Sequence, residues 1–421
     1  MSVTRRQLLA RAGLAAGGVA LGPATAAPAR AAPDLRSWKG VRAQFALDAR
    51  HIHLTSFLLA AHPAPVRAAI ERHRRGLDAD PVGYLHANEQ RLEDAARAAA
   101  ARYLGGSTDA IALTDSTTMG LALLYRGLRL KPTEEVLTTD HDFYATHESL
   151  RLAGLRVRRV RLHDDAKAAT VDAIVSRLKR AVGPRTRVVA LTWVHSSTGV
   201  KLPLTAIAAA LPERVLLCVD GVHGFGVEDA GVRELRCDAL ASGCHKWLHG
   251  PRGTGILWTS DRLRELLRPT IPSFSDGESF RAWFQGGAPA GAPDGRRLTP
   301  GGFHSFEQRW ALSEAFRFHE RIGPRRIEAR VHALATRLKR GLGELPHVRL
   351  RTPLAPRLSA GLVCFEVDGF SPPEVVERLA ARRIVASVTP YARSYVRLGP
   401  GIVNSEAEID AAVSALRALR R

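Results

Sequence analysis

The residues best suited to chemistry in this chain are an aspartate and a lysine that lie close to apolar stretches. Asp220 ends the apolar run 215–219, and Lys246 lies between His245 and a Gly-Pro turn at 250–251. A lysine held away from water loses its proton readily and becomes a nucleophile, and a carboxylate stabilises a cation beside it. The pair therefore predicts a site that bonds a carbonyl group covalently and holds a positive charge next to it.

Pyridoxal 5′-phosphate (PLP) is the cofactor that this pair favours. Its aldehyde forms a Schiff base with a lysine, and a carboxylate beside its ring nitrogen keeps that nitrogen protonated. The protonated ring is an electron sink for negative charge at the Cα of an amino acid. We therefore expect Lys246 to hold PLP and Asp220 to pair with the ring, although an aspartate at a strand end can also be structural.

Two segments offer groups for the cofactor phosphate. Ser116, Thr117 and Thr118 begin a predicted helix directly after the predicted strand 111–114. The free N–H groups at a helix start bind phosphate, and the carboxyl ends of strands in an α/β sheet gather in one place. His245, beside the lysine, is placed to reach the same phosphate. Taken alone, the three hydroxyl residues are an ordinary helix cap.

Three more residues follow predicted strands and suit the pyridine ring. His141 can stack on the ring and move protons, Ser196 can hydrogen-bond the phenolic oxygen, and His223 fits near that oxygen or over the ring face. Each also has a structural explanation, because histidines and polar turns after strands are common. We assign none of these residues to a metal.

The elements that must position these residues are strands alternating with helices. Apolar strands are expected at 111–114, 136–139, 157–162, 188–193, 215–219 and 256–258, and helices at 64–74, 88–103, 116–128, 171–181 and 204–211. Such alternation predicts an α/β fold with a mainly parallel sheet covered on both faces. A long helix at 305–322, followed by mixed strands and helices, predicts a smaller α+β domain at the C-terminus.

The organisation divides the chain into four parts. Residues 1–31 are expected to be a signal peptide, 32–60 an N-terminal arm, 61–290 the large PLP-binding domain and 291–421 the small C-terminal domain. The last boundary lies in a loop at 286–302 that is rich in glycine and proline, which are the residues that most often interrupt regular structure.

The first 31 residues have the pattern of a twin-arginine export signal. Arg5-Arg6 precedes a moderately apolar run from 13 to 27, and Ala29-Arg30-Ala31 gives a small-residue cleavage site. We expect export to the periplasm or beyond, and removal of the signal lowers the formal charge from +20 to +16. The alternative is an N-terminal helix of the fold that happens to contain two arginines.

Composition excludes several classes of protein. The charge of +20 is carried largely by dispersed arginines, which is more typical of a solvated surface than of a nucleic-acid track, so no nucleic-acid partner is expected. No apolar run of about 18 residues follows residue 30, so no membrane insertion is expected after signal removal. The cysteines show no CxxC spacing and are expected to be buried free thiols: Cys218, Cys237, Cys244 and Cys364.

Two stretches resemble the fold-type I PLP enzymes of aminotransferase class V. They are His-Lys-Trp-Leu-His-Gly-Pro-Arg-Gly-Thr-Gly at 245–255 and Thr-Thr-Asp-His-Asp-Phe-Tyr-Ala-Thr-His-Glu at 138–148, both most similar to the isopenicillin N epimerase-like branch. The resemblance runs from about residue 50 to the C-terminus. It implies a large domain with a mainly parallel seven-stranded sheet, a smaller α+β domain and a homodimer.

The resemblance also assigns roles to residues. It gives Lys246, Asp220, His141 and His223 the roles proposed above. Arg397 matches the small-domain arginine that grips the substrate carboxylate, for which a planar guanidinium is well suited. Two further positions match the family pattern: Asn404, and Gly302 with Gly301 in a segment that approaches the phosphate from the partner subunit.

Three departures from the family pattern limit the reaction. The segment 386–392 has no cysteine where desulfurases carry their nucleophile, so persulfide formation is not expected. Gly243 stands where many relatives have a hydroxylated phosphate ligand. Ser196 stands where an asparagine is frequent.

The sequence thus favours an exported PLP enzyme acting at the Cα of an amino acid, or of an amino-acid unit in a larger secondary metabolite. Racemisation or epimerisation is the first expectation, with a small-molecule amino acid or peptide as substrate. The enzymatic alternatives are a periplasmic aminotransferase that tailors a peptide siderophore, and a C–S lyase. The alternative of a different class is a catalytically silent binding protein on the same fold.

Overall fold

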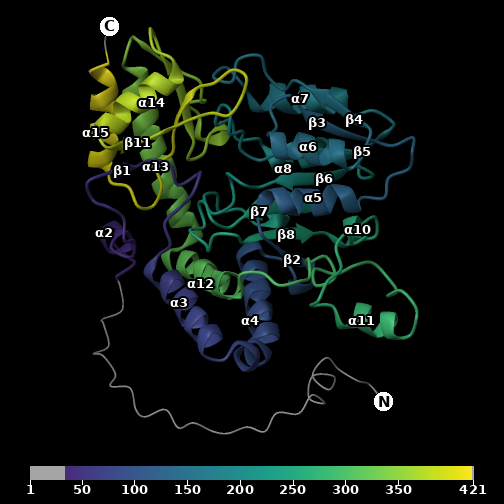
Figure 1. Cartoon of the computed structure of the whole chain (residues 1–421). Coiled ribbons are helices and arrows are strands. Elements are labelled where there is room, and N and C mark those ends of the chain that lie inside the picture. The colour runs from purple at the N-terminus through teal and green to yellow at the C-terminus, as the bar shows by residue number, and fades with distance from the viewer. Residues whose placement is uncertain (1–33, 420–421) are drawn as a thin grey trace, which may run out of the picture.

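The computed structural model describes residues 34–419, which form a large sheet-based domain and a smaller C-terminal domain beside it (Figure 1). The predicted signal at 1–31 lies outside the described residues. Within them, no helix combines the length and the apolar character that a bilayer span requires. All four cysteines are buried and free, as predicted.

The large domain is built on a seven-stranded sheet with the order β2-β8-β7-β6-β5-β3-β4. All neighbours are parallel except β8, which runs antiparallel to β2 and β7. This arrangement confirms the predicted fold. The strand bounds are β2 Ile111–Thr114, β3 Glu135–Thr139, β4 Val157–Val160, β5 Thr186–Thr192, β6 Leu216–Asp220, β7 Ala239–Gly243 and β8 Gly255–Thr259.

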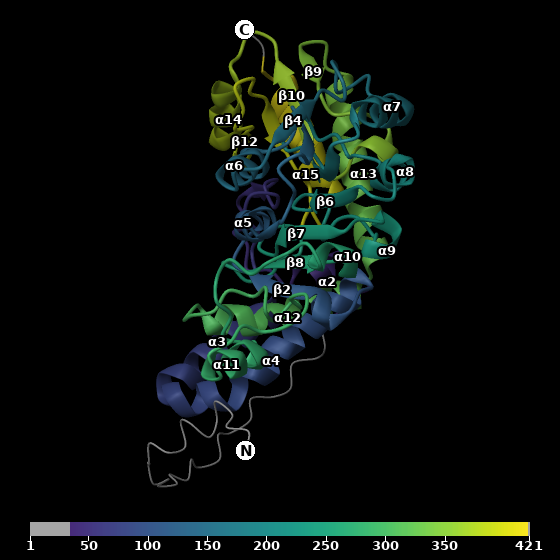
Figure 2. The same ribbon diagram turned by 90° about the vertical axis from the view of Figure 1, so that its right-hand side faces the viewer.

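Helices cover both faces of this sheet, because the central strands are apolar on both sides. The helices on one face are α5 Thr117–Gly127 and α6 Tyr144–Leu152, and on the other α7 Val171–Ala181, α8 Leu204–Ala210 and α9 Val232–Leu235 (Figure 2). Each face therefore has its own apolar core. Long helices pack together beyond the β2 edge: α3 Ala64–Ala79, α4 Pro81–Leu104 and α12 Phe306–Ile322.

The small domain is a four-stranded antiparallel sheet with the order β12-β13-β10-β9, packed against helices. Its strands are β9 Val348–Leu350, β10 Val363–Val367, β12 Ser387–Val388 and β13 Val396–Leu398, and its helices are α13 Pro324–Gly343, α14 Pro372–Ala381 and α15 Glu406–Arg417. The arm strand β1 Ile52–His53 pairs with β11 Ile384–Val385. The remaining helices are α2 Trp38–Arg42, α10 Asp261–Arg264 and α11 Gly277–Phe284.

The division between the two domain cores differs from the boundary predicted at residue 291. Helix α12 and the start of α13, up to Val331, pack in the large-domain core, whereas α13 from Leu334 onward packs in the small-domain core. Leu54 of the predicted arm also belongs to the small-domain core. The glycine- and proline-rich loop interrupts regular structure without ending the core, because the amphipathic helix after it folds back onto α3 and α4.

Candidate active site

The sheet brings Asp220 and Lys246 to the same edge. Asp220 is the last residue of β6 and pairs with Ala241 of the neighbouring parallel strand β7, and Lys246 follows β7 directly. Burial raises the pKa of Asp220 to about 6, against the lowering effect of the Val222 N–H, which donates to Oδ1 at 3.1 Å. Burial likewise lowers the pKa of Lys246 to about 8, against the effect of Asp220. The predicted pair therefore exists as two electrostatically coupled groups.

A lowered pKa alone does not identify a reactive lysine, as Lys339 in α13 shows. Burial lowers the pKa of Lys339 to about 8 as well. However, its ammonium donates to the carbonyl oxygens of Pro353 and Leu354 and to Ser359 Oγ, at 3.0, 3.1 and 2.6 Å, so all three donors are used. Within residues 34–419, no such set of acceptors holds Lys246. Its side chain is partly buried and its amine is chemically available, as a nucleophile requires.

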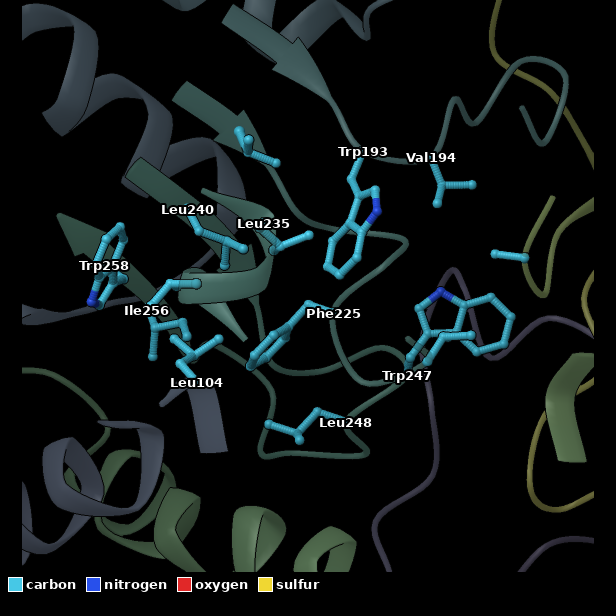
Figure 3. Close-up of a cluster of buried hydrophobic side chains, with 14 of the residues drawn as sticks. Leu104, Trp193, Val194, Phe225, Leu235, Leu240, Trp247, Leu248, Ile256 and Trp258 are labelled. Atoms are coloured by element: carbon cyan, nitrogen blue, oxygen red, sulfur yellow. The ribbon is translucent and has the colours of Figure 1, made fainter. Parts of the chain in front are cut away.

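The segment that carries Lys246 is fixed by apolar anchors directly after it. Trp247 and Leu248 are 3% and 1% exposed and insert into the core beside Phe225 and Trp193 (Figure 3). The N–H of His249 donates to the Lys246 carbonyl at 2.8 Å, and His249 has a left-handed φ of 55°. Such a conformation costs a non-glycine residue about 1–2 kcal/mol, so the surrounding packing holds this turn in place.

The predicted phosphate-binding helix start is well formed. Ser116 caps α5 by accepting from the Met119 N–H at 3.1 Å, and Thr117 Oγ1 accepts from the Gly243 N–H at 2.7 Å, which joins α5 to β7. Thr118 is exposed. The two inner hydroxyls are therefore used as acceptors within the chain. They remain donors toward a phosphate, together with the first backbone N–H groups of the helix.

Gly243 and His245 are sterically linked. A Cβ on Gly243 would lie 2.8 Å from His245 Cε1 and 3.3 Å from Thr117 Oγ1, so the imidazole occupies the space that a larger residue would need. His245 Nδ1 is buried and has no hydrogen-bond partner within the described residues. Gly243 lacks the hydroxyl that many relatives have at this position. The ring of His245 fills that space instead and offers a nitrogen next to the predicted phosphate-binding start of α5.

His141 is held in one tautomer and one plane. Its Nε2 accepts from the Leu162 N–H at 3.2 Å, and its ring stacks on His163 with centroids 3.9 Å apart and an interplanar angle of 14°. Burial and the neighbouring histidines lower its pKa far below the usual range. A neutral imidazole with Nε2 engaged suits stacking on a ring, and it is a poor proton carrier. Of the two predicted roles, this geometry favours stacking.

Two residues of this region had no assigned role from the sequence. His163, which braces His141, follows the predicted strand 157–162 in the same way that His141 follows its own strand. Asp142 is 2% exposed and accepts four hydrogen bonds, from Thr138 Oγ1, from the N–H and Oγ1 of Thr139, and from the Thr192 N–H. Its carboxylate joins β3 to β5 and contributes to the raised pKa of Asp220.

His223 and Ser196 lie in the same charged environment as the lysine. His223 is 4% exposed, its Nδ1 has no hydrogen-bond partner within the described residues, and burial with the charges of Lys246 and Arg397 lowers its pKa. Ser196 is buried and its Oγ lies 2.7 Å from Tyr391 Oη. Tyr391 comes from the small domain, and only its place in the segment 386–392 could have pointed to it from the sequence.

Arg397 is a buried cation without a carboxylate partner among the described residues. It is 3% exposed, its Nε donates to Ser387 Oγ at 3.1 Å, its Nη1 donates to the Ser196 carbonyl at 3.3 Å, and it stacks on Phe57 at 4.5 Å. A guanidinium held in this way is suited to an anionic group supplied by a ligand. The predicted carboxylate site is therefore built by residues from both domains.

The other two family positions lie apart from this group. Asn404 accepts from the Gly401 N–H at 2.9 Å and donates to the His53 carbonyl at 3.1 Å, so it joins the arm to the small domain. Gly302 has a φ of +98°, and a Cβ there would meet no atom within 4 Å. The space beside Gly302 is therefore open among the described residues, and its role toward a partner subunit stays a prediction.

The residues present fit PLP. A buried acid is available for the ring nitrogen, a partly buried amine for the aldehyde, and an imidazole held by His163 for the ring face. Among the described residues, one ring nitrogen of His223 and one of His245 have no hydrogen-bond partner. Buried polar atoms are usually hydrogen-bonded, so a polar, anionic ligand is expected to bind them. The structure therefore brings together Ser116, Thr117, His141, Ser196, Asp220, His223, His245, Lys246 and Arg397.

Several known proteins are similar to this chain. It is 30% identical to an isopenicillin N epimerase from Streptomyces clavuligerus over 91% of this chain and 98% of that one. It is 28% identical to a probable cysteine desulfurase from Mycobacterium leprae over 76% of this chain and 49% of the other. A solved structure of a mutant of the enzyme C-DES, with glycine covalently linked to its PLP cofactor, has the same fold with a TM-score of 0.81 at 24% identity, covering 90% of this chain and 99% of that one.

The family assignment follows from a match over most of the chain. The model of the family described as aminotransferase class V matches residues 60–411, which include every residue of the site. The chain therefore belongs to the aminotransferase class V family, whose cofactor is PLP, as the lysine and aspartate predicted.

Proposed function

We propose that this chain is an exported epimerase or racemase that acts at the Cα of an amino acid or of an amino-acid unit in a secondary metabolite. The similarity to isopenicillin N epimerase along nearly the whole of both chains supports this function. The observation that carries it is the site's chemistry. Among residues 34–419, Lys246 has an available amine and the buried Arg397 has no carboxylate partner, and the segment 386–392 has no thiol.

The residues of the chain have distinct tasks in this reaction. PLP, when bound, supplies an electron sink that stabilises negative charge at Cα. Arg397 binds the substrate carboxylate, and Lys246, with its pKa near 8, removes the Cα proton as a base. Asp220 holds the positive charge of the ring nitrogen, and His141 fixes the ring plane. Epimerisation is completed when a proton returns to the opposite face of Cα.

Two other outcomes share these first steps. Amino-group transfer would follow if the proton did not return to Cα, as in the proposed siderophore-tailoring aminotransferase. Loss of a β-substituent gives a C–S lyase, and the similarity to a probable cysteine desulfurase supports this alternative. The missing thiol disfavours persulfide chemistry, because a desulfurase needs a nucleophilic sulfur to receive the sulfur atom.

A single incubation series separates these outcomes. The purified holoenzyme is incubated in D₂O with isopenicillin N and with a panel of free L- and D-amino acids, including cysteine. We expect deuterium at Cα together with inversion, without keto acid or sulfide. Keto-acid formation without inversion would replace the proposal by aminotransfer, and sulfide release would replace it by a lyase. A protein that turns over no member of the panel and shows no cofactor absorbance would favour a silent binding protein.

We also propose export by the twin-arginine route, which carries folded proteins and so suits a cofactor-loaded enzyme. The pair Arg5-Arg6 and the cleavage site at 29–31 support it. Expression of the full chain should yield a mature form that begins at residue 32 outside the cytoplasm. The double substitution Arg5→Lys, Arg6→Lys should hold the uncleaved protein in the cytoplasm, whereas export of this variant at the wild-type level would contradict the assignment.

A further inference from the structure

Two positions at which the sequence departs from the class V pattern are in contact with each other. Ser196, where an asparagine is frequent, and the segment 386–392, which lacks the desulfurase cysteine, were independent observations in the sequence. In the structure, Ser196 Oγ and Tyr391 Oη lie 2.7 Å apart, within hydrogen-bonding distance across the two domains. The segment that lacks the thiol therefore supplies a phenol, and this phenol contacts the residue of the other departure.

Tyr391 lies among residues of the candidate site. Its ring packs edge-on against that of Phe143, which follows Asp142 in the chain, with ring centroids 5.9 Å apart. Its hydroxyl interacts electrostatically with Asp142, Asp220 and Arg397. Ser196, which holds the hydroxyl, also accepts from Arg397 through its carbonyl at 3.3 Å. The phenol and the carboxylate-binding guanidinium are thus positioned by the same turn.

A two-base epimerase needs a second proton carrier, on the face of Cα that the first base does not reach. Lys246 can serve only one face of Cα. His141 is unsuited to the other face, because its Nε2 is engaged by a backbone N–H and its ring is held neutral between histidines. Arg397 does not release protons at physiological pH. Burial raises the pKa of the Tyr391 hydroxyl, so it carries its hydrogen at neutral pH, and it reaches the site from the small domain.

We propose that Tyr391, positioned by Ser196, is the second proton carrier of the epimerisation. This inference rests on the proposed function. In one direction, Lys246 takes the hydrogen from Cα and becomes an ammonium, while the O–H bond of Tyr391 breaks and its proton forms the new C–H bond. The phenolate then recovers a proton from solvent through the Ser196 hydroxyl, and Lys246 releases its proton to solvent. The reverse direction exchanges the two roles, and no oxidant or reductant is needed.

The test compares exchange with inversion in three variants of the holoenzyme. Tyr391→Phe removes the hydroxyl and keeps the ring, Ser196→Ala removes only its partner, and Tyr395→Phe is the matched control, because Tyr395 lies in the same segment under Arg351 and Arg393. In D₂O, with isopenicillin N and the L-amino acids of the panel, Tyr391→Phe should still exchange the Cα hydrogen with retention. Its inversion should fall about 100-fold or more, the size of a lost general acid.

Two results of this comparison of exchange and inversion would overturn the role of Tyr391. Inversion by Tyr391→Phe at the wild-type rate, or an equal fall of exchange and inversion, would remove Tyr391 from this role. If the wild-type enzyme itself exchanges the Cα hydrogen without inversion, the proposed epimerase function is overturned. Failure of the epimerase function and failure of the role of Tyr391 are therefore distinguishable. Ser196→Ala should reduce inversion less than Tyr391→Phe and shift its pH profile, and Tyr395→Phe should change neither rate.

A readout without cofactor checks the contact itself. In the cofactor-free protein, Tyr391→Phe and Ser196→Ala should each lower the free energy of unfolding measured in urea. The decrease in the double variant should be smaller than the sum of the decreases in the two single variants. Such non-additivity is expected for groups in direct contact. Strict additivity would contradict the hydrogen bond on which the proton carrier depends.

Discussion

At the scale of the residue, the site holds ionisable groups where water does not stabilise them. Asp220 and Lys246 are both shifted toward their neutral forms, with pKa values of about 6 and 8. A shift of one pKa unit corresponds to about 1.4 kcal/mol between the two protonation states. These groups therefore reduce the stability of the cofactor-free protein, and binding of a cationic ring beside Asp220 relieves part of that cost.

Replacement of the acid tests this cost in the cofactor-free protein. Because the folded-state pKa of Asp220 is raised from 3.8 to about 6, the contribution of this group to stability is present below pH 4 and is lost as the pH rises through 6. Asp220→Asn should therefore stabilise the cofactor-free protein at pH 7, on the order of 3 kcal/mol, and lose this advantage below pH 4.

Urea unfolding at pH 4 and pH 7 measures the difference, with Asp165→Asn, an exposed aspartate, as the control that should change little. An advantage of Asp220→Asn that is equal at both pH values would contradict the burial argument. In the PLP-loaded protein, the same variant should lose most of its activity, because the ring nitrogen has no anionic partner.

At the scale of the element, the strand that precedes the lysine is the one strand of the seven-stranded sheet that the sequence does not predict. Strand β7 reads Ala-Leu-Ala-Ser-Gly and lacks the β-branched residues that mark strands. Small residues are needed there because helix α5 packs closely on it: a Cβ on Gly120 would lie 3.2 Å from the Ala241 Cβ. The packing requirement thus hides the strand signal, although Lys246 itself was recognisable from its neighbours.

The other misses at the site have a similar cause. Asp142 and His163 act through contacts between strands that are distant in sequence, and Tyr391 acts through a contact between domains. The residues found from sequence lie directly after apolar strands, where local pattern is informative. Long-range partners leave no local pattern, so only the folded chain identifies them.

Gly243 provides a test of the element-scale account. Gly243→Ser introduces the hydroxylated residue that many relatives have, but its Cβ would meet His245 Cε1 at 2.8 Å. We expect weaker PLP binding, by about tenfold or more, because the imidazole must move. The double variant Gly243→Ser, His245→Ala should recover affinity through the new hydroxyl. Absorbance titration with PLP measures this, and equal loss in single and double variants would contradict the steric link.

At the scale of the whole molecule, several large apolar side chains are exposed in the segment between β8 and α12. Trp283 and Phe284 of α11 are 69% and 57% exposed, and Phe303 is 84% exposed, next to Gly302. Exposed apolar groups gathered in one segment are typical of a protein interface. The predicted homodimer, in which Gly302 serves the partner's phosphate site, offers an occupant for this surface.

Sedimentation of the holoenzyme tests this prediction. The wild-type protein should sediment as a dimer, and the double substitution Trp283→Ser, Phe284→Ser should shift it toward monomer and weaken PLP binding. Leu152→Ser, at a residue that is 59% exposed on α6, is the control and should leave the dimer intact. A wild-type monomer that binds PLP fully would show that no second subunit completes the site.

The central claim is the covalent attachment of the cofactor at one lysine. Borohydride reduction of the PLP-loaded protein, followed by digestion and mass spectrometry, should place the cofactor on the peptide that contains Lys246. Lys339, with a similarly lowered pKa but three hydrogen-bond acceptors, should remain unlabelled in the same sample. A Lys246→Ala variant that still gives the reduced adduct at the wild-type level, or label on Lys339 instead, would contradict the account.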